Sequence, residues 1–188
     1  MSLSSDTTDS NKSQYWDLKY ENNEVGWDIN EPTPIFTKYF KDFKGKNKKI
    51  LIPGSGNGHD AIFLAELGFE VFTVDFSKVA NNNLKIKSKK KCLSIEIINK
   101  DFFNLNKYDD YFDVILEYTF FCAIIPENRS KYIKKVYTLL KGNGLFVGIL
   151  FPLYRNISDP SPPFAINLKF VINQFSKYFT NIKYKKSN

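Results

Sequence analysis

Apolar and polar positions follow one another in blocks of changing period, and the clearest block begins at Ile50. The run from Ile50 to Ile52 is apolar and meets a glycine-rich stretch, which is typical of a buried strand entering a tight turn. Apolar residues then recur at helical spacing up to Gly68, where the helix is expected to end. A second apolar run over residues 70–74 stops at Asp75. The pattern therefore predicts a strand, a turn, a helix and a second strand in succession.

The same alternation continues to the end of the chain. Further elements are predicted as strands at residues 94–99, 111–116 and 145–150 (the last fully buried), helices at 132–140 and 168–179, and a short strand at 182–185. Alternating strands and helices imply an α/β fold with a doubly wound, mostly parallel sheet that binds ligands at the carboxyl ends of its strands. The residues expected at such ends are Asp75, Asp101, Glu117, Tyr118 and Phe151.

Length and composition indicate one globular domain, because 188 residues with 43% hydrophobic content can bury a sizeable core. We expect residues 1–13 to be a mobile N-terminus, since they are polar and lack the apolar stretch of a secretion signal, and residues 14–188 to form the domain. No apolar run reaches the ~20 residues of a membrane span. Cys92, Cys122 and the single histidine, His59, provide neither a disulfide framework nor metal-ligand spacing. A cytoplasmic monomer without metal or membrane partner is therefore expected.

The formal net charge of +7 raises the question of a nucleic-acid partner. Lysines cluster at residues 46–49, 85–91 and 183–186, on the borders of predicted elements, and the chain has only two arginines, Arg129 and Arg155. Recognition of bases and phosphates relies on arginine forks, so a solvated surface is favoured over a nucleic-acid groove. A positive field that attracts small anions is a milder interpretation of the same charge.

The spacing of the glycines narrows the choice of ligand. Gly54, Gly56 and Gly58 form G-x-G-x-G, whereas the dinucleotide fingerprint is G-x-G-x-x-G. Such a turn presents backbone N–H groups at the start of a helix, and Asp75 follows about 20 residues after the first glycine, where a ribose would be bound. The alternative is a structural turn without a ligand. With this spacing the unit resembles motif I of class I S-adenosylmethionine (SAM) methyltransferases.

A longer resemblance is carried by residues 117–124, which read Glu-Tyr-Thr-Phe-Phe-Cys-Ala-Ile. This block resembles the signature of the thiopurine methyltransferase superfamily, and more closely that of its thiol/halide methyltransferase branch. Other blocks agree in order, and the resemblance covers about residues 15–164. These blocks are Trp16-Asp17, Gly26-Trp27-Asp28, Pro32-Thr33-Pro34, the glycine turn, Asp101-Phe102-Phe103, Phe151-Pro152 and Pro162-Pro163-Phe164.

The chain departs from the family pattern at a few positions. Ser55 stands where the family usually has cysteine, Tyr20 where many members have tryptophan, and Glu117 where aspartate is more common. After Lys186 there is no pattern for the final antiparallel strand of most class I methyltransferases, and we expect that strand to be missing.

The resemblance implies SAM as the cofactor, S-adenosyl-L-homocysteine as the product, and a set of binding residues. Asp75 would accept hydrogen bonds from the ribose, although an acid ahead of Ser77 also suits a helix N-cap. Asp101 would lie beside the adenine, although aspartate also begins turns readily. The cofactor-binding residues implied are Trp16, Tyr20, Trp27, Gly54, Gly56, Gly58, Asp75, Asp101, Phe102, Glu117 and Tyr118.

Trp16, Tyr20 and Trp27 precede the core fold, on a segment that the resemblance favours as a lid over the cofactor. Indole rings above a sulfonium gain ~0.5–2 kcal/mol from cation–π attraction. The alternative is an N-terminal helix whose aromatic residues simply pack into the core.

The predicted reaction is methyl transfer from SAM to a small anionic nucleophile: a halide, thiocyanate, bisulfide or small thiol. Such a nucleophile needs no general base, and an apolar pocket that excludes water favours in-line displacement. The residues expected to form the pocket and orient the reactants are Trp16, Trp27, Tyr118 and Phe151. The alternatives are a methyltransferase for a larger acceptor (a thiopurine-like heterocycle, nucleic acid or protein) and a SAM-binding module without activity.

Overall fold

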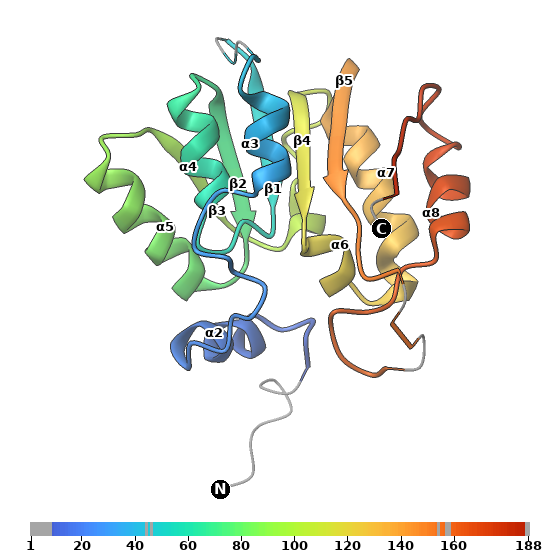
Figure 1. Ribbon diagram of the computed structural model, residues 1–188, viewed down its shortest axis with the longest axis horizontal. Helices are drawn as coiled ribbons and strands as arrows, with labels where there is room; N and C mark the ends of the chain where they lie inside the picture. Colours follow the sequence, from blue (N-terminus) through green and yellow to red (C-terminus); the bar gives the residue numbers. More distant parts are fainter. Residues whose placement is uncertain (1–8, 44, 46, 154, 157–158, 187–188) are drawn as a thin grey trace, which may run out of the picture.

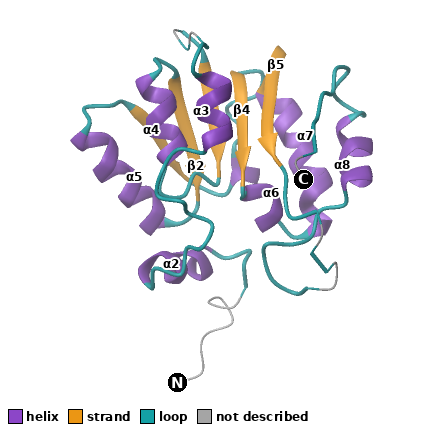
Figure 2. Cartoon of the chain, in the orientation of Figure 1, coloured by secondary structure: helices purple, strands orange, loops and turns teal. Residues whose placement is uncertain are grey.

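The computed structural model describes residues 9–43, 45, 47–153, 155–156 and 159–186. A five-stranded sheet lies between two layers of helices, with neighbouring strands parallel in the order β3-β2-β1-β4-β5 (Figures 1 and 2). The predicted doubly wound α/β fold is therefore confirmed. The strands are β1 (Lys49–Pro53), β2 (Glu70–Asp75), β3 (Ile95–Asn99), β4 (Phe112–Tyr118) and β5 (Leu140–Ile149).

Strand alternation divides the core into two halves, one on each face of the sheet. Ile50 and Ile52 of β1 point into one half, whereas Leu51 points into the other. The helices of the first half are α3 (Pro34–Phe40), α4 (His59–Glu66) and α5 (Lys78–Lys90). Those of the second half are α6 (Phe120–Ala123), α7 (Arg129–Leu139) and α8 (Leu168–Phe175), with the 3₁₀ turns η1 (Phe102–Asn104) and η2 (Pro126–Asn128) nearby in the chain.

Helix α2 (Ser13–Glu21) belongs to neither layer. Figure 1 shows it below the arrowheads of the strands, at the carboxyl edge of the sheet. Asp17 attaches it to the start of α5, because its Oδ1 accepts hydrogen bonds from the Ser77 hydroxyl at 2.6 Å and from the Val79 N–H at 3.2 Å. Helix α2 therefore lies at the edge of the sheet where doubly wound folds bind ligands.

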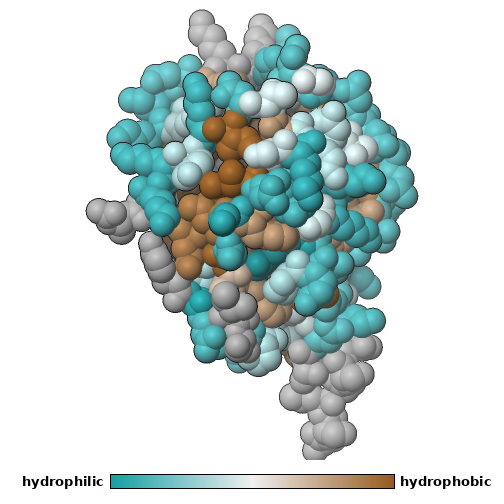
Figure 3. All heavy atoms as spheres, turned by 90° about the vertical axis from the view of Figure 1, so that its right-hand side faces the viewer, coloured by the Kyte–Doolittle hydropathy of each residue, from teal (hydrophilic) through white to brown (hydrophobic). Residues whose placement is uncertain are grey.

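Two expectations about the C-terminal part are wrong. The strand predicted as fully buried is part of β5, which is partly exposed along most of its length because it pairs only with β4 among the described residues. Residues 181–186, which include the short strand expected at 182–185, form no strand. Figure 3 views this side of the molecule and shows a band of hydrophobic residues at the surface.

In the described ranges, no helix combines the length and the apolar character that crossing a bilayer requires.

Candidate active site

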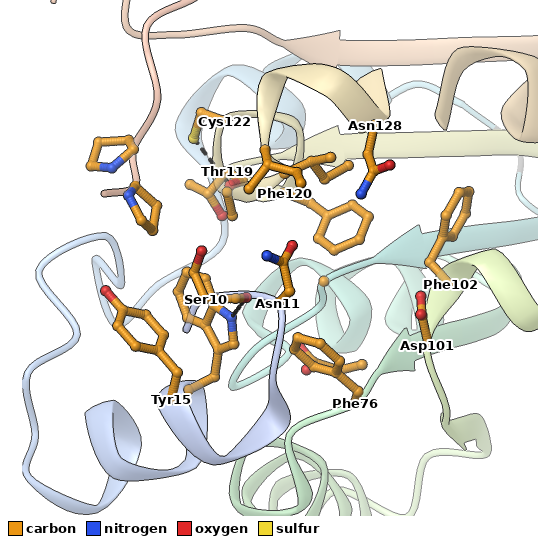
Figure 4. Close-up of a pocket in the computed structure, with 18 of the residues that line it drawn as sticks. Ser10, Asn11, Tyr15, Phe76, Asp101, Phe102, Thr119, Phe120, Cys122 and Asn128 are labelled. Atoms are coloured by element: carbon orange, nitrogen blue, oxygen red, sulfur yellow. Dashed lines mark hydrogen bonds between the residues drawn. The ribbon is translucent and has the colours of Figure 1, made fainter. Parts of the chain in front are cut away.

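A cavity of about 340 Å³ opens at the carboxyl edge of the sheet, between the strand ends and the N-terminal segment (Figure 4). Gly54, Asp75 and Asp101 reach it from the ends of β1, β2 and β3, so the glycine turn and both predicted acids meet in one place. Most of the remaining wall is aromatic or aliphatic: Tyr15, Trp16, Tyr20, Trp27, Val74, Phe76, Phe102, Phe103, Phe120, Ala123, Ile124, Ile125, Phe151, Pro162 and Pro163.

The three glycines of the turn all adopt left-handed backbone angles, but different neighbours require them. A Cβ on Gly54 would lie 2.4 Å from the Phe120 ring, and one on Gly58 would lie 2.2 Å from the Leu84 side chain. Gly56 faces Tyr20 instead, whose hydroxyl oxygen would be 2.7 Å from an added Cβ. Gly54 and Gly58 therefore let the turn pack into the protein, while Gly56 lets the N-terminal helix approach it.

We expect Gly58→Ala to lower the free energy of unfolding by roughly 1–3 kcal/mol, from the strained backbone and the contact with Leu84 together. Urea denaturation measures the change. Gly142→Ala is the matched control, because a Cβ there meets no atom within 4 Å and its backbone is not left-handed. Equal stability of the two variants would contradict the packing role of Gly58.

Asp75 connects the turn to the end of β2. Its Oδ2 accepts a hydrogen bond from the Gly56 N–H at 3.1 Å, and its Oδ1 accepts one from the Ser77 N–H at 2.9 Å. Burial raises the pKa of Asp75 to about 6, although these backbone hydrogen bonds favour the ionised form. Each oxygen keeps a free lone pair, so the carboxylate can still accept from a ligand in the cavity.

Phe76, Asp101 and Phe102 form one end of the cavity (Figure 4). Asp101 Oδ1 accepts a hydrogen bond from the Phe103 N–H at 2.9 Å and caps η1, so the turn-starting role considered for it is realised. Its carboxylate remains exposed at the cavity. The arrangement offers a flat ligand two aromatic faces and an acceptor.

The aromatic residues of the N-terminal segment form a connected cluster. The Trp27 ring packs edge-to-face against Trp16, with 5.5 Å between centroids, and against Tyr20 at 6.0 Å. The Trp16 indole N–H donates to the Ser10 carbonyl at 2.8 Å, which holds Ser10 and Asn11 against the cavity (Figure 4). Residues 1–8 of the segment expected to be mobile lie outside the described part of the chain.

A smaller cavity of about 60 Å³ lies next to the first, on the other side of the glycine turn. Gly56, Gly58 and Tyr118 line it, whereas Trp27 and Gly54 line both cavities. Tyr118 packs against Phe36 and against Phe151, which belongs to the wall of the larger cavity.

Asp28 attaches the Trp27 segment to the turn. Burial would raise the pKa of Asp28, but hydrogen bonds from His59, from the Asn57 amide and from the Asn30 N–H hold it well below its usual range. The Asp28 carboxylate and the His59 ring nitrogen are 3.2 Å apart. Asp28 therefore attaches its neighbour Trp27 to the glycine turn.

Glu117 lines neither cavity. Alternation along β4 puts it on the face of Ile115, where its carboxylate is fully buried and accepts from the Tyr132 hydroxyl at 2.5 Å and the Phe121 N–H at 2.7 Å. The structure therefore does not bring the Glu117 side chain to the cavities, and its expected place beside the cofactor stays a prediction. Its bond to Phe121 instead fixes the start of α6, which supplies Phe120 to the cavity wall.

Burial raises the pKa of Glu117 to about 7. The folded state then binds a proton that the unfolded chain releases above its ordinary value of 4.5, so stability from this group is present below about 4.5 and is lost as pH rises to about 7. Glu117→Gln keeps an acceptor for the Phe121 N–H and removes the titration. We expect the variant's melting temperature to fall less between pH 5 and 8 than that of the wild type, and parallel curves would contradict this.

Sequence reasoning missed several cavity residues. Phe76 follows Asp75 directly, so its place at a strand end was a usable signal. Thr119 and Cys122 belong to the 117–124 block that carries the resemblance, but they were not expected at the site. The local pattern indicates no ligand for Ser10, Asn11, Tyr15, Asn128 and Lys131.

The doubly wound sheet, with a glycine turn and two acids at its strand ends, has the Rossmann-like architecture found in class I methyltransferases. A structure of Burkholderia thailandensis 1,6-didemethyltoxoflavin-N1-methyltransferase with bound S-adenosylhomocysteine matches it with a TM-score of 0.72 over 95% of this chain and 80% of that one. The sequence identity is 14%, so this likeness concerns the fold alone.

Sequence comparisons identify the family. The profile of the family described as thiopurine S-methyltransferase matches residues 11–187. The chain belongs to this family and is a SAM-dependent methyltransferase, as the resemblance predicts. It is 28% identical over 160 residues to probable thiol methyltransferase 2 of Arabidopsis thaliana, covering 84% of this chain and 70% of that protein. It is also 28% identical over 155 residues to thiocyanate methyltransferase 1 of the same plant, covering 81% and 67%.

Proposed function

We propose that this protein transfers the methyl group of SAM to a small anionic sulfur or halide nucleophile, such as thiocyanate, bisulfide or iodide. The observation that carries the proposal is the composition of the cavity. Among the described residues that line it, the acidic acceptors lie at the strand-end side, while the wall at Phe151, Pro162 and Pro163 is apolar. The likeness to thiol and thiocyanate methyltransferases supports the same substrate class.

The residues present fit SAM. Asp75 would hold the ribose, and Phe76, Asp101 and Phe102 would hold the adenine. The turn at Gly54 separates this region from the smaller cavity, which suits the methionine end. When bound, SAM supplies an electrophilic methyl group on a positively charged sulfur.

The chain's own contribution is positioning and the exclusion of water. Trp16 and Trp27 cover one side of the cavity, and Phe151 lies on another. An anion that enters loses much of its hydration and becomes more reactive toward a cationic donor. Cys122 lines the cavity, but burial raises the pKa of its thiol to about 12, which keeps it protonated and unsuited to act as a base. The reaction therefore favours a nucleophile that needs no deprotonation.

The size of the cavity supports a small acceptor. A volume of about 340 Å³ is near the lower end of the ~300–1,000 Å³ typical of ligand sites, and the cofactor would occupy much of it. Little space then remains for a second substrate with a large ring system.

Incubating the protein with SAM and iodide, thiocyanate or bisulfide, and measuring the volatile products by gas chromatography, tests the proposal. Turnover of at least one of these anions is expected to exceed that of 6-mercaptopurine at equal concentration. Turnover of the heterocycle alone would instead support the larger-acceptor alternative. No turnover with any acceptor, despite binding of SAM, would support the binding module.

A further inference from the structure

Arg129, the first residue of α7, is a buried cation without a carboxylate partner in the described part of the chain. Only 4% of its surface is exposed. The guanidinium donates to the Ala165 carbonyl at 2.7 Å and to the Phe164 carbonyl at 3.0 Å, while its Nε is buried without a partner. Burying a charge that is not neutralised is costly, so its position calls for a reason.

The guanidinium lies directly behind one wall of the cavity. Phe164, which accepts its hydrogen bond, donates its own N–H to the Cys122 carbonyl at 2.7 Å. Cys122 and the residue before Phe164, Pro163, both line the cavity. In Figure 4, Cys122 lies at the end opposite Asp101 and Phe102. Arg129 therefore stands behind the end that the proposed SAM site leaves for the acceptor.

Three other charged residues lie near this wall. Arg155, the second arginine of the chain, belongs to the loop after Phe151 and is paired with Asp159. Glu117 faces Cys122 from β4, but burial raises the pKa of its carboxyl to about 7, so part of its population is neutral near that pH. Glu127, which also acts on Arg129, lies in η2 and is exposed. Arg129 and Arg155 therefore favour a negative charge at this wall, and the ionised fraction of Glu117 opposes them.

Lys131, which also lines the cavity, is a poorer source of positive charge for this wall. Its ammonium lies over the Phe103 ring, 4.6 Å from the centroid, next to the adenine end. A flexible lysine at the cavity rim is also solvated, so its charge is screened more than that of a buried guanidinium.

We propose that Arg129 makes the wall of Cys122, Pro162 and Pro163 the anion-binding end of the cavity. The inference rests on the proposed function and deepens it, because it says where the acceptor binds and why an anion is preferred. Arg129 acts through the wall without touching the acceptor, so it is a positioning residue. A unit charge across a few ångströms of protein has a strong effect, since its field there is weakly screened. The same residue clamps the loop after Pro163, and the test has to separate charge from clamp.

The first test compares Arg129→Met, which removes the charge, with Arg129→Lys, which keeps it but loses the fork that binds both carbonyls. Thiocyanate is the anionic acceptor, and dimethyl sulfide is a neutral control. We expect the KM for thiocyanate to rise about tenfold or more in the Met variant and less than about threefold in the Lys variant. The KM for dimethyl sulfide and the Kd for SAM should change little in either. Equal losses in both variants, or losses for both acceptors, would mean that Arg129 is only a clamp.

A second pair keeps Arg129 intact and covers the case in which its variants fail to fold. Ala123 lines the cavity next to Cys122, so Ala123→Asp adds a negative charge there and Ala123→Asn adds the same bulk without charge. The Asp variant is expected to have a KM for thiocyanate about tenfold above that of the Asn variant, with equal values for dimethyl sulfide. Equal KM values for thiocyanate would overturn the assignment. Thiocyanate turnover by the wild type separates the proposed function from the role of Arg129. If it is absent, both are overturned; if it is present, the variants decide the role of Arg129.

Discussion

Replacing Asp75 with asparagine is expected to weaken SAM binding by about 100-fold or more while changing the stability of the fold little. The carboxylate would accept two hydrogen bonds from the ribose, and bonds to a charged group contribute ~1.5–3 kcal/mol each. An amide has one acceptor oxygen where Asp75 has two, and its NH₂ would face either the Gly56 or the Ser77 N–H. Isothermal titration calorimetry with SAM measures the loss.

The stability part of this prediction follows from the pKa of Asp75. Burial raises that pKa to about 6, so at neutral pH the folded protein holds a carboxylate that its surroundings disfavour. Asparagine removes this cost but leaves one backbone N–H facing its NH₂, so the two effects oppose each other and the melting temperature of the ligand-free protein at pH 7 should change little. A loss of binding without a matching loss of stability is characteristic of a group retained for function.

The pH dependence provides an independent readout. A carboxyl with a pKa near 6 becomes protonated as the pH falls below that value, so the wild type should lose SAM affinity by about tenfold per unit below pH 6. The Asp75→Asn variant should show no such slope. Asp101→Asn is the control for the pH slope alone: whatever its SAM affinity, the slope below pH 6 should remain, because Asp75 is intact. A large Tm loss in Asp75→Asn with unchanged SAM affinity would reduce Asp75 to a structural N-terminal cap.

The strands and the glycine turn could be predicted because their signals are local. The apolar run at Ile50, the glycines and the acid at the end of β2 specify their own backbone and their own end of the sheet. The proximity of the acids at the strand ends could also be predicted, since parallel strands place all their carboxyl ends at one edge of the sheet.

Long-range partners could not be predicted in this way. The orientation of Glu117 depends on Tyr132, 15 residues later, whose hydroxyl donates a hydrogen bond to the buried carboxylate. The residues next to Glu117 in the sequence do not indicate this partner. Strand alternation did hold a clue, since adjacent residues such as Glu117 and Tyr118 cannot both face the same side. The exposure of β5 depends on whether another strand covers its outer edge, and a run of apolar residues does not reveal that.

The cavity wall shows the same limit. Cys122 has the composition of a small core residue, and the structure does bury it, yet its surface forms part of the cavity. In the sequence, nothing distinguishes Arg129 from a solvated surface cation. Its burial becomes visible only when the loop at Phe164 folds back over it. Sequence therefore predicts the strand-end side of the cavity better than the side of Cys122, because the second side is built from a short helix and a loop.

Replacing Trp27 with alanine is expected to lower kcat by about 100-fold while changing the Kd for SAM by less than about threefold. Trp27 packs edge-to-face with Trp16 and Tyr20, lines both cavities and is tied to the glycine turn through Asp28. Its loss would admit water to the space where the nucleophile is held. Steady-state kinetics with thiocyanate and calorimetry with SAM measure the two quantities.

The kinetic signature separates two roles of the indole that predict opposite results. As a cation–π partner, Trp27 would stabilise the sulfonium of bound SAM by ~0.5–2 kcal/mol, and that charge disappears as the methyl group moves to an anion. Removing such a contact would weaken SAM binding and leave kcat unchanged or higher, because only interactions stronger in the transition state accelerate the reaction. As a wall that excludes water, Trp27 would act on kcat instead. Trp27→Phe keeps much of the wall and should retain most of the turnover, so weak SAM binding with normal kcat in Trp27→Ala would assign the residue to the cofactor rather than to the acceptor.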